Sequence, residues 1–292
     1  VKNKKSRSVK QLTLISSILL GILQGVTEFL PVSSSGHLAI AEHLLNMTEA
    51  SEIPQFFDVL LHLGTLIAVF IAYREDILEM IQEFILGISD IAHGSTPVPV
   101  PPARRLIILI IAGTLPLFAV LPIKDRVESL GDNMYFVAGA LLVTGILLYA
   151  SDRVGKGRKT EKSAPIISAL LVGVGQAIAT CPGISRSGTT ITAGCFAGYD
   201  RRFAVRFSFL LSIPAILGAN ILSLKDAIEA GIIWAEVPLY LAGVATAAAV
   251  GYLCLWLLRY IAERGKFGFF AYYCWLAGAA TLALTLIQSK LQ

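Results

Sequence analysis

Two polar turns, 152 residues apart, carry the side chains of this sequence that are best suited to chemistry. Residues 24–37 hold a glutamine, a glutamate, three consecutive serines and a histidine, and residues 176–190 hold an arginine among serines, threonines and glycines. A carboxylate and an imidazole beside a hydroxyl can activate a nucleophile and carry its proton. An arginine in a hydroxyl- and glycine-rich turn that opens a helix can bind phosphate. Together the two turns contain the parts of a phosphoryl-transfer site.

The two turns belong to a longer internal repeat. A shift of 152 positions aligns eight identical pairs without a gap, namely Ser16/Ser168, Leu19/Leu171, Gly21/Gly173, Gln24/Gln176, Ser33/Ser185, Ser35/Ser187, Gly36/Gly188 and Ala41/Ala193. The copies differ where the chemistry differs. The first has Glu28, Ser34 and His37, and the second has Thr180, Arg186 and Thr189 at those positions. We therefore expect the first copy to supply an acid, a candidate nucleophile and an imidazole, and the second a fixed cation.

Composition places these turns in an integral membrane protein. Hydrophobic residues make up 55% of the 292 positions and charged residues only 15%, whereas soluble domains have about 25% charged residues. The net charge of +4 is modest, and the cations lie in short loops without interleaved aromatic residues. Binding to nucleic acid is therefore not expected.

Hydropathy predicts an all-α polytopic membrane protein. The chain has eight apolar stretches, at about 12–30, 56–73, 106–123, 134–150, 166–181, 207–224, 237–258 and 269–288. Six are close to the ~20 residues needed to cross a bilayer. The first and fifth instead break at a proline and a Ser/Gly turn. A continuous span would expose those polar groups to lipid, so we predict two re-entrant helix-turn-helix hairpins with six transmembrane helices.

The order of hairpin, three spans, hairpin, three spans inverts the second half relative to the first, as in many transporters. We expect one domain over residues 1–292, with inverted repeats at about 12–150 and 166–288, and with the two turns meeting near the midplane. Fourteen Lys and Arg residues fall in the loops of one side, against four on the other, or nine with the N-terminal tail. The positive-inside rule places the first group in the cytoplasm.

Structural interpretations of the same residues compete with the chemical interpretation. A single Ser/Gly turn after a proline is usually only a turn or a helix cap, but two matched copies at membrane depth favour function. His37 is expected to be catalytic because Ser34 and Glu28 accompany it. His62, on the apolar stretch 56–73, is expected to be a packed or hydrogen-bonded helix residue, with lining of the site as the alternative. Residues 74–92 alternate apolar and acidic side chains at helical spacing, which is typical of an amphipathic interfacial helix.

At these turns the chain resembles a known family, the undecaprenyl-pyrophosphate phosphatases linked to bacitracin resistance. Residues 24–37 fit that family's (Glu/Gln)xxxGlu motif with its Ser/Gly/His turn, and residues 182–190 fit its second motif. The resemblance covers essentially the whole chain and agrees with the fold inferred above. It implies hydrolysis of a polyprenyl (C55) pyrophosphate to its monophosphate, which recycles the lipid carrier of cell-wall synthesis.

The resemblance also implies roles for individual residues. Ser34 is the favoured nucleophile, His37 its proton partner, Glu28 an activating or metal-binding carboxylate and Arg186 the pyrophosphate clamp. The substrate cradle is expected from Gln24, Ser33, Ser35, Gly36, Ser185, Ser187, Gly188, Thr189 and Thr190. Members depend on Mg²⁺ or Ca²⁺, which suits oxygen ligands and phosphate. Some members have glutamate where this chain has Gln24, so one charged ligand is missing here.

The family also sets expectations for surroundings and partners. The protein is expected in the cell membrane, with its site open to the extracytoplasmic side, and a homodimer is expected because members are often dimeric. Whether Ser34 or a water molecule attacks stays open. The alternative function is an inverted-repeat transporter or flippase for a polyprenyl phosphate or another anion. Transport needs the anion cradle but no nucleophile, so the Ser34/His37/Glu28 group favours the phosphatase.

Overall fold

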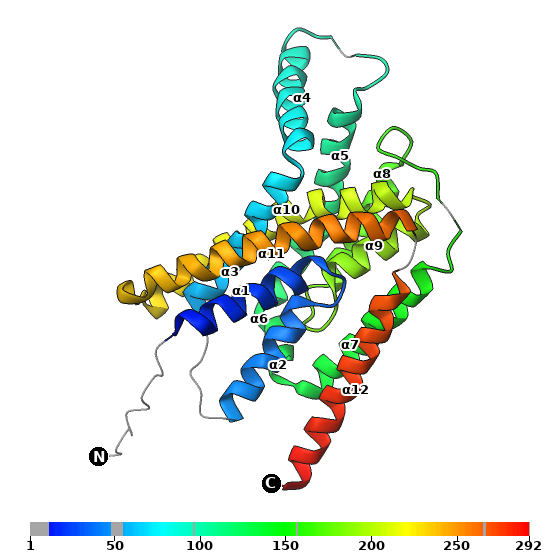
Figure 1. Ribbon diagram of the computed structural model, residues 1–292. Coiled ribbons are helices and arrows are strands. Elements are labelled where there is room, and N and C mark those ends of the chain that lie inside the picture. The colour runs from blue at the N-terminus through cyan, green and yellow to red at the C-terminus, as the bar shows by residue number, and fades with distance from the viewer. Residues whose placement is uncertain (1–11, 48–54, 96, 156, 265–266, 292) are drawn as a thin grey trace.

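The computed structural model of the protein describes residues 12–47, 55–95, 97–155, 157–264 and 267–291 (Figure 1). The described residues form helices joined by short turns, with one isolated β-bridge between Lys159 and Tyr199. The helices, in order, are α1 (Leu14–Phe29), α2 (Ser34–Met47), α3 (Gln55–Ala72), α4 (Arg74–Ala92), α5 (Pro102–Thr114), η1 (Leu115–Ala119), η2 (Leu121–Ile123), α6 (Lys124–Glu128), η3 (Ser129–Asp132), α7 (Met134–Ser151), α8 (Ile166–Ile178), α9 (Arg186–Phe196), α10 (Arg201–Ala230), η4 (Trp234–Glu236), α11 (Val237–Arg264) and α12 (Gly268–Leu291). The expected all-α fold is confirmed.

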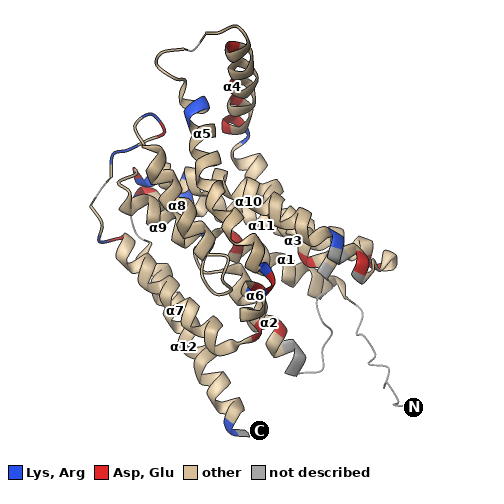
Figure 2. Cartoon of the chain, turned by 180° about the vertical axis from the view of Figure 1, so that it is seen from behind, with Lys and Arg blue, Asp and Glu red and all other residues tan. Residues whose placement is uncertain are grey.

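The structure has five helical segments that are long and apolar enough to cross a bilayer, or six if the bent pair α3–α4 counts as one broken span. The five run over Pro102–Asp132, Met134–Ser151, Arg201–Lys225, Trp234–Arg264 and Gly268–Lys290. Charged residues lie mostly at helix ends and in loops, and α7 and most of α12 carry none (Figure 2). A multi-pass membrane protein is the fold that such helices build.

The helix α4 leaves α3 at an angle of 80° and projects beside α5 (Figure 1). It is amphipathic as predicted, and two of its acids turn toward the neighbouring helix, whereas Glu75 and Glu79 are exposed. Arg104 of α5 donates to Glu83 at 3.1 and 3.2 Å and to Asp90 at 2.8 Å. The apolar side chains of α4, such as Phe84 and Ile88, are exposed. A helix that presents both apolar and charged side chains outward suits the membrane interface.

The helices pack through small residues. The helices α1 and α3 both lie against α11, and α7 runs along α12. A Cβ added to Gly21 would come within 2.5 Å of the carbonyl oxygen of Gly243, so α1 and α11 approach as closely as their backbones allow. Close approach through glycine is the usual way in which membrane helices gain van der Waals contact. This contact fixes the position of α1 and of the turn that follows it.

Both polar turns form the tips of helix-turn-helix units, α1–α2 and α8–α9. Each turn ends in the same cap: the Ser33 hydroxyl accepts from the Gly36 amide at 3.2 Å, and the Ser185 hydroxyl accepts from the Gly188 amide at 3.1 Å. Such caps satisfy amides that a helix start leaves unpaired. Ser33 and Ser185, which the repeat aligns, therefore cap the following helix in the same way in both copies.

The tips of the two units meet. A Cβ on Gly36 would lie 2.8 Å from the Cα atom of Gly183, so only glycine allows this contact between the turns. Gly183 itself has φ of 93°, a conformation that glycine adopts without strain. From α7, the Thr144 hydroxyl donates to the Gly183 carbonyl and accepts from the Ser185 amide, both at 3.0 Å. The second turn is therefore held by the first turn on one side and by α7 on the other.

Candidate active site

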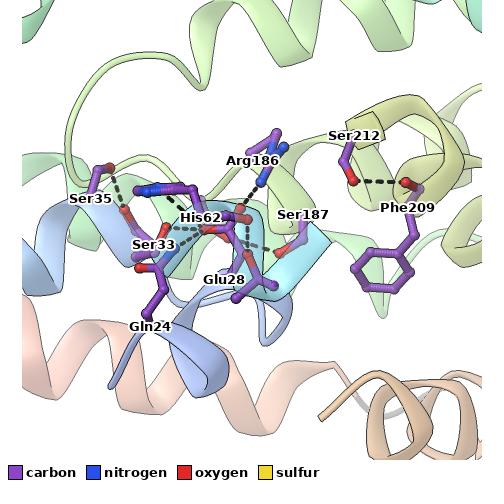
Figure 3. A network of polar contacts seen from close by, with 12 residues as sticks. Gln24, Glu28, Ser33, Ser35, His62, Arg186, Ser187, Phe209 and Ser212 are labelled. Carbon is purple, nitrogen blue, oxygen red and sulfur yellow. Dashed lines mark hydrogen bonds and ion pairs between the residues drawn. The ribbon is translucent and has the colours of Figure 1, made fainter. Parts of the chain in front are cut away.

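The carboxylate of Glu28 is the centre at which the two turns converge (Figure 3). Its Oε2 atom accepts hydrogen bonds from Ser34 Oγ at 2.7 Å and from Gln24 Nε2 at 3.0 Å. Its Oε1 atom accepts from the guanidinium of Arg186, which reaches it from the other helix-turn-helix unit. Three of the four expected catalytic residues, Glu28, Ser34 and Arg186, are therefore in direct contact.

Helix geometry explains the first half of this arrangement. Gln24 and Glu28 are four residues apart on α1, so their side chains lie on the same helix face. The chain then turns at Pro31, where Ser33 has a φ of 73°, a rare conformation for a residue with a side chain. Strained backbone of this kind is concentrated at functional sites. After this turn α2 begins at Ser34, whose hydroxyl points back to Glu28.

The Glu28 side chain is only 1% exposed, whereas that of Arg186 is 23% exposed. A buried carboxylate is stable only when it is paired and hydrogen-bonded. Arg186 supplies the counter-charge, and Ser34 and Gln24 supply donors. The arginine retains access to the solvent side of the contact, so an incoming anion can reach it while Glu28 is still covered.

His62 of α3 makes the helix hydrogen bond that was expected of it and also follows the alternative, because it lines the cavity. It lines the same cavity as Glu28, and its Nε2 atom lies 3.9 Å from Glu28 Oε2. Its other ring nitrogen, Nδ1, is 3.0 Å from the Asp58 carbonyl one turn earlier. The rule that an ionisable residue inside an apolar span marks a functional site would have identified it.

His37 lies elsewhere. Its Nδ1 atom is 2.8 Å from the Ser33 carbonyl, its Nε2 atom is 2.8 Å from the Tyr273 hydroxyl of α12, and its ring stacks on that of Tyr273. Both ring nitrogens are thus engaged away from Ser34. The structure does not bring His37 to the hydroxyl whose proton it was expected to take, because the first turn of α2 directs the side chains at 34 and 37 to different neighbours.

The expected cradle residues divide into two groups. Ser33, Ser35 and Ser185 line the cavity with Ser34 and Arg186. Thr190 instead bonds to Ser208 of α10 at 2.6 Å and to the Arg186 carbonyl at 2.8 Å, so it anchors α9. The remaining candidates, absent from the cavity lining, are Gln24, Gly36, Ser187, Gly188 and Thr189. The amides of Gly36 and Gly188 already donate to the capping serines.

The cavity has a volume of about 560 Å³ and two kinds of wall. The polar end is formed by the tips of the two units and by His62. The other wall is apolar and comes from η1, η2, α6 and the second half of α10, with Leu117, Phe118, Val120, Leu121, Val127, Ile216, Ile221 and Leu222. The lining also contains polar residues that the sequence reasoning did not assign to the site, namely Thr27, Thr114, Lys124, Glu128, Gln176, Thr180 and Asn220. A pocket of this kind fits an amphiphile with an anionic head.

A divalent cation can be held here only in part by protein oxygens. Glu28 offers a carboxylate, and Gln24 Oε1 is buried without a partner among the described residues. Oxygen ligands of this type suit Mg²⁺ or Ca²⁺. Within the described ranges, however, no group of three His, Cys, Asp or Glu residues could hold a metal. The residues therefore fit a cation that shares its coordination with phosphate oxygens, as Mg²⁺ commonly does.

Comparisons with known proteins agree with this chemistry. The sequence model described as "Bacitracin resistance protein BacA" matches residues 17–280. A protein named undecaprenyl-diphosphatase from Alkaliphilus metalliredigens is 40% identical over 277 residues, which cover 94% of this chain and 100% of that protein. Proteins of the same name from Methanosphaera stadtmanae and Methanobrevibacter smithii are 40% and 44% identical, over 94% and 91% of this chain and 99% and 95% of their own lengths. This chain belongs to the bacitracin resistance protein BacA family.

Proposed function

We propose that the protein is an undecaprenyl-diphosphatase, which hydrolyses the terminal phosphate of a polyprenyl diphosphate and leaves the monophosphate. The observation that carries this proposal is the contact of Ser34, Glu28 and Arg186 at the polar end of an apolar cavity. A hydroxyl with an adjacent base, beside a cation, is what phosphoryl transfer requires. The names of the relatives point to the same reaction.

In this mechanism Ser34 attacks the terminal phosphorus. The 2.7 Å hydrogen bond to Glu28 Oε2 gives the proton of the hydroxyl a direct acceptor, so Glu28 serves as general base. The Oγ–P bond forms, the bond from that phosphorus to the bridging oxygen breaks, and polyprenyl monophosphate leaves with the proton that Glu28 took from Ser34. Water then attacks the phosphoserine phosphorus and passes a proton to Glu28. The P–Oγ bond breaks, Glu28 returns that proton to Ser34 Oγ, and inorganic phosphate leaves.

Arg186 changes partner during this cycle. Without substrate its guanidinium is bonded to Glu28. A diphosphate carries more charge than a carboxylate and offers several acceptor oxygens in the geometry that a guanidinium binds best. When Arg186 turns to the phosphate, Glu28 loses its counter-ion beside the Ser34 proton and becomes a better base. Substrate binding and activation of the nucleophile are thereby coupled.

His62 takes the proton-carrier role that was expected of His37. It lines the cavity and is 3.9 Å from the carboxylate that receives the Ser34 proton. An imidazole is suited to this task because its unperturbed pKa lies near neutral pH. His37, bonded to Tyr273, instead holds α2 against α12.

The apolar wall accommodates the start of the lipid chain. The cavity volume of about 560 Å³ is that of a pocket for a drug-sized ligand. A C55 chain is much larger, so only the isoprene units next to the diphosphate lie inside, and the rest extends into the bilayer. This arrangement fixes the head group. The site therefore discriminates little between lipids of different chain length.

The divalent cation expected from the family resemblance is proposed to bind at the same site. Glu28, with the unpartnered Oε1 of Gln24 nearby on α1, would hold Mg²⁺ or Ca²⁺ together with substrate oxygens. The bound cation would neutralise phosphate charge in the transition state. The dimer expected from the family resemblance stays a prediction.

We further propose that α1–α2 and α8–α9 are re-entrant hairpins in an inverted repeat, with six spans around them, and that the site opens to the extracytoplasmic side of the cell membrane. Three features support this. Both units are short apolar helices followed by polar turns, the tips of the units meet, and the basic loops concentrate on one side. Cysteine labelling of single-cysteine variants in intact cells, at positions 126 and 158, tests the orientation. Only position 126 should react with an impermeant reagent.

The activity is tested with detergent-purified protein and farnesyl or undecaprenyl diphosphate. Phosphate release is expected from the unaltered protein and not from Ser34→Ala. Absence of release from the unaltered protein with Mg²⁺ or Ca²⁺ would contradict the proposal. None of the reported relatives is named as a transporter. Translocation of lipid in liposomes without phosphate release would nevertheless identify a flippase.

A further inference from the structure

Gln176 of α8 is a buried carboxamide without a partner at the wall of the active-site cavity. The residue is only 1% exposed and lines the same cavity as Glu28 and Arg186. Neither its Nε2 nor its Oε1 atom finds a hydrogen-bond partner within the described part of the chain. Native proteins satisfy nearly all of their buried polar side chains, so an amide with both ends free requires an explanation.

The internal repeat provides a matched comparison. Gln24 occupies the aligned position in the first copy, and its Nε2 donates to Glu28, four residues later on the same helix. Four residues after Gln176 the chain has Thr180, whose hydroxyl donates to the Ala177 carbonyl at 2.7 Å. Gln176 therefore has the orientation of a site residue but lacks the carboxylate that its counterpart binds.

The cavity determines what can satisfy this amide. A carboxamide offers two N–H donors and carries no charge. The group expected to enter the polar end beside Arg186 is a diphosphate, which presents only acceptor oxygens when ionised. Arg186 binds it as a cation, and an amide on the opposite arm of the same unit can donate a further hydrogen bond without adding charge to the membrane interior.

We propose that Gln176 is a substrate-positioning residue whose Nε2 atom donates to a diphosphate oxygen of the bound lipid. The proposal rests on the diphosphatase function given above. In the substrate-free protein the amide of this side chain makes no hydrogen bond to the described residues. Its contribution appears only when the substrate arrives. Loss of the amide should therefore weaken binding without weakening the fold.

The test replaces Gln176 by Met, which keeps the length of the side chain and removes both polar atoms. The variant Gln176→Leu is a second apolar replacement in case the first misfolds. With farnesyl diphosphate, kcat/KM should fall about 10- to 100-fold, the range for one hydrogen bond to a charged group. The loss should appear in KM and as a matching rise in the Ki of methylenediphosphonate. The thermal unfolding midpoint without ligand should stay the same or rise.

The matched control is Ser17→Ala on α1. Ser17 is also fully buried with an unpartnered hydroxyl, but it does not line the cavity, and its repeat counterpart is Ala169. Its removal should leave kcat, KM and Ki unchanged. If both Gln176 variants bind methylenediphosphonate as the unaltered protein does, the proposal is overturned. It is also overturned if kcat alone falls, or if activity falls only in proportion to lost folded protein.

Substrates with lipid chains of different length show whether Gln176 contacts the head group or the tail. The loss in kcat/KM should be the same factor for farnesyl and undecaprenyl diphosphate, because the amide contacts the part that both share. A factor that grows with chain length would place Gln176 on the lipid and overturn the assignment. Failure of the diphosphatase function itself gives a different result, since the unaltered protein would then release no phosphate from either lipid.

Discussion

Replacing Arg186 by Ala separates the two tasks of its guanidinium, which are to hold the fold of the substrate-free site and to bind phosphate. The change leaves the Glu28 carboxylate, 1% exposed, without its counter-charge. Removing one partner of a buried ion pair costs about 3–5 kcal/mol. Because Arg186 is itself 23% exposed, the lower end applies, at about 3 kcal/mol. At roughly 2–4 °C per kcal/mol this lowers the unfolding midpoint by about 6–12 °C.

A second variant isolates the cause. In the double variant Glu28→Gln/Arg186→Ala no charge is left unpaired, so the unfolding midpoint in detergent should recover most of the loss. Activity should not recover, because both the base and the phosphate clamp are gone, and kcat/KM should stay at least about 10³-fold below that of the unaltered protein. Equal midpoints of the single and double variants would refute the reasoning that the buried ion pair stabilises the substrate-free site.

Other predictions concern single contacts. The Ser34→Ala change should lower kcat at least about 10³-fold with little effect on the unfolding midpoint. If this variant instead turns over at the normal rate and without a burst, water is the nucleophile. The His62→Ala change should lower kcat about 10²- to 10⁴-fold. His37→Ala should mainly lower the free energy of unfolding, by about 1 kcal/mol for each of its two hydrogen bonds; the reverse order would restore His37 as proton carrier. Gly36→Ala should destabilise by about 1–3 kcal/mol because its Cβ meets the facing turn, while Gly139→Ala, with open space around it, should be tolerated. Circular dichroism melts distinguish these two glycines.

Membrane insertion and the helical class were predictable because they depend on composition and segment length. A bilayer admits only helices or closed barrels, so long apolar stretches define where the spans lie. The pair of polar turns was predictable for a related reason. Polar residues at membrane depth are costly, so two matched copies of them indicate function without any knowledge of their contacts.

The sequence by itself determined which residue types the site contains: a carboxylate, serines and an arginine, on two turns that must meet. Only the tertiary structure decided which side chains face one another. His37 and Ser34 are three residues apart, yet the backbone of the first turn of α2 sends one to Tyr273 and the other to Glu28. His62 is 34 residues from Glu28 and reaches it because α3 packs beside α1. Spacing along a helix fixes the direction in which each side chain points. The packing of the helices decides which residues each side chain meets, and the chemistry of the site depends on those contacts.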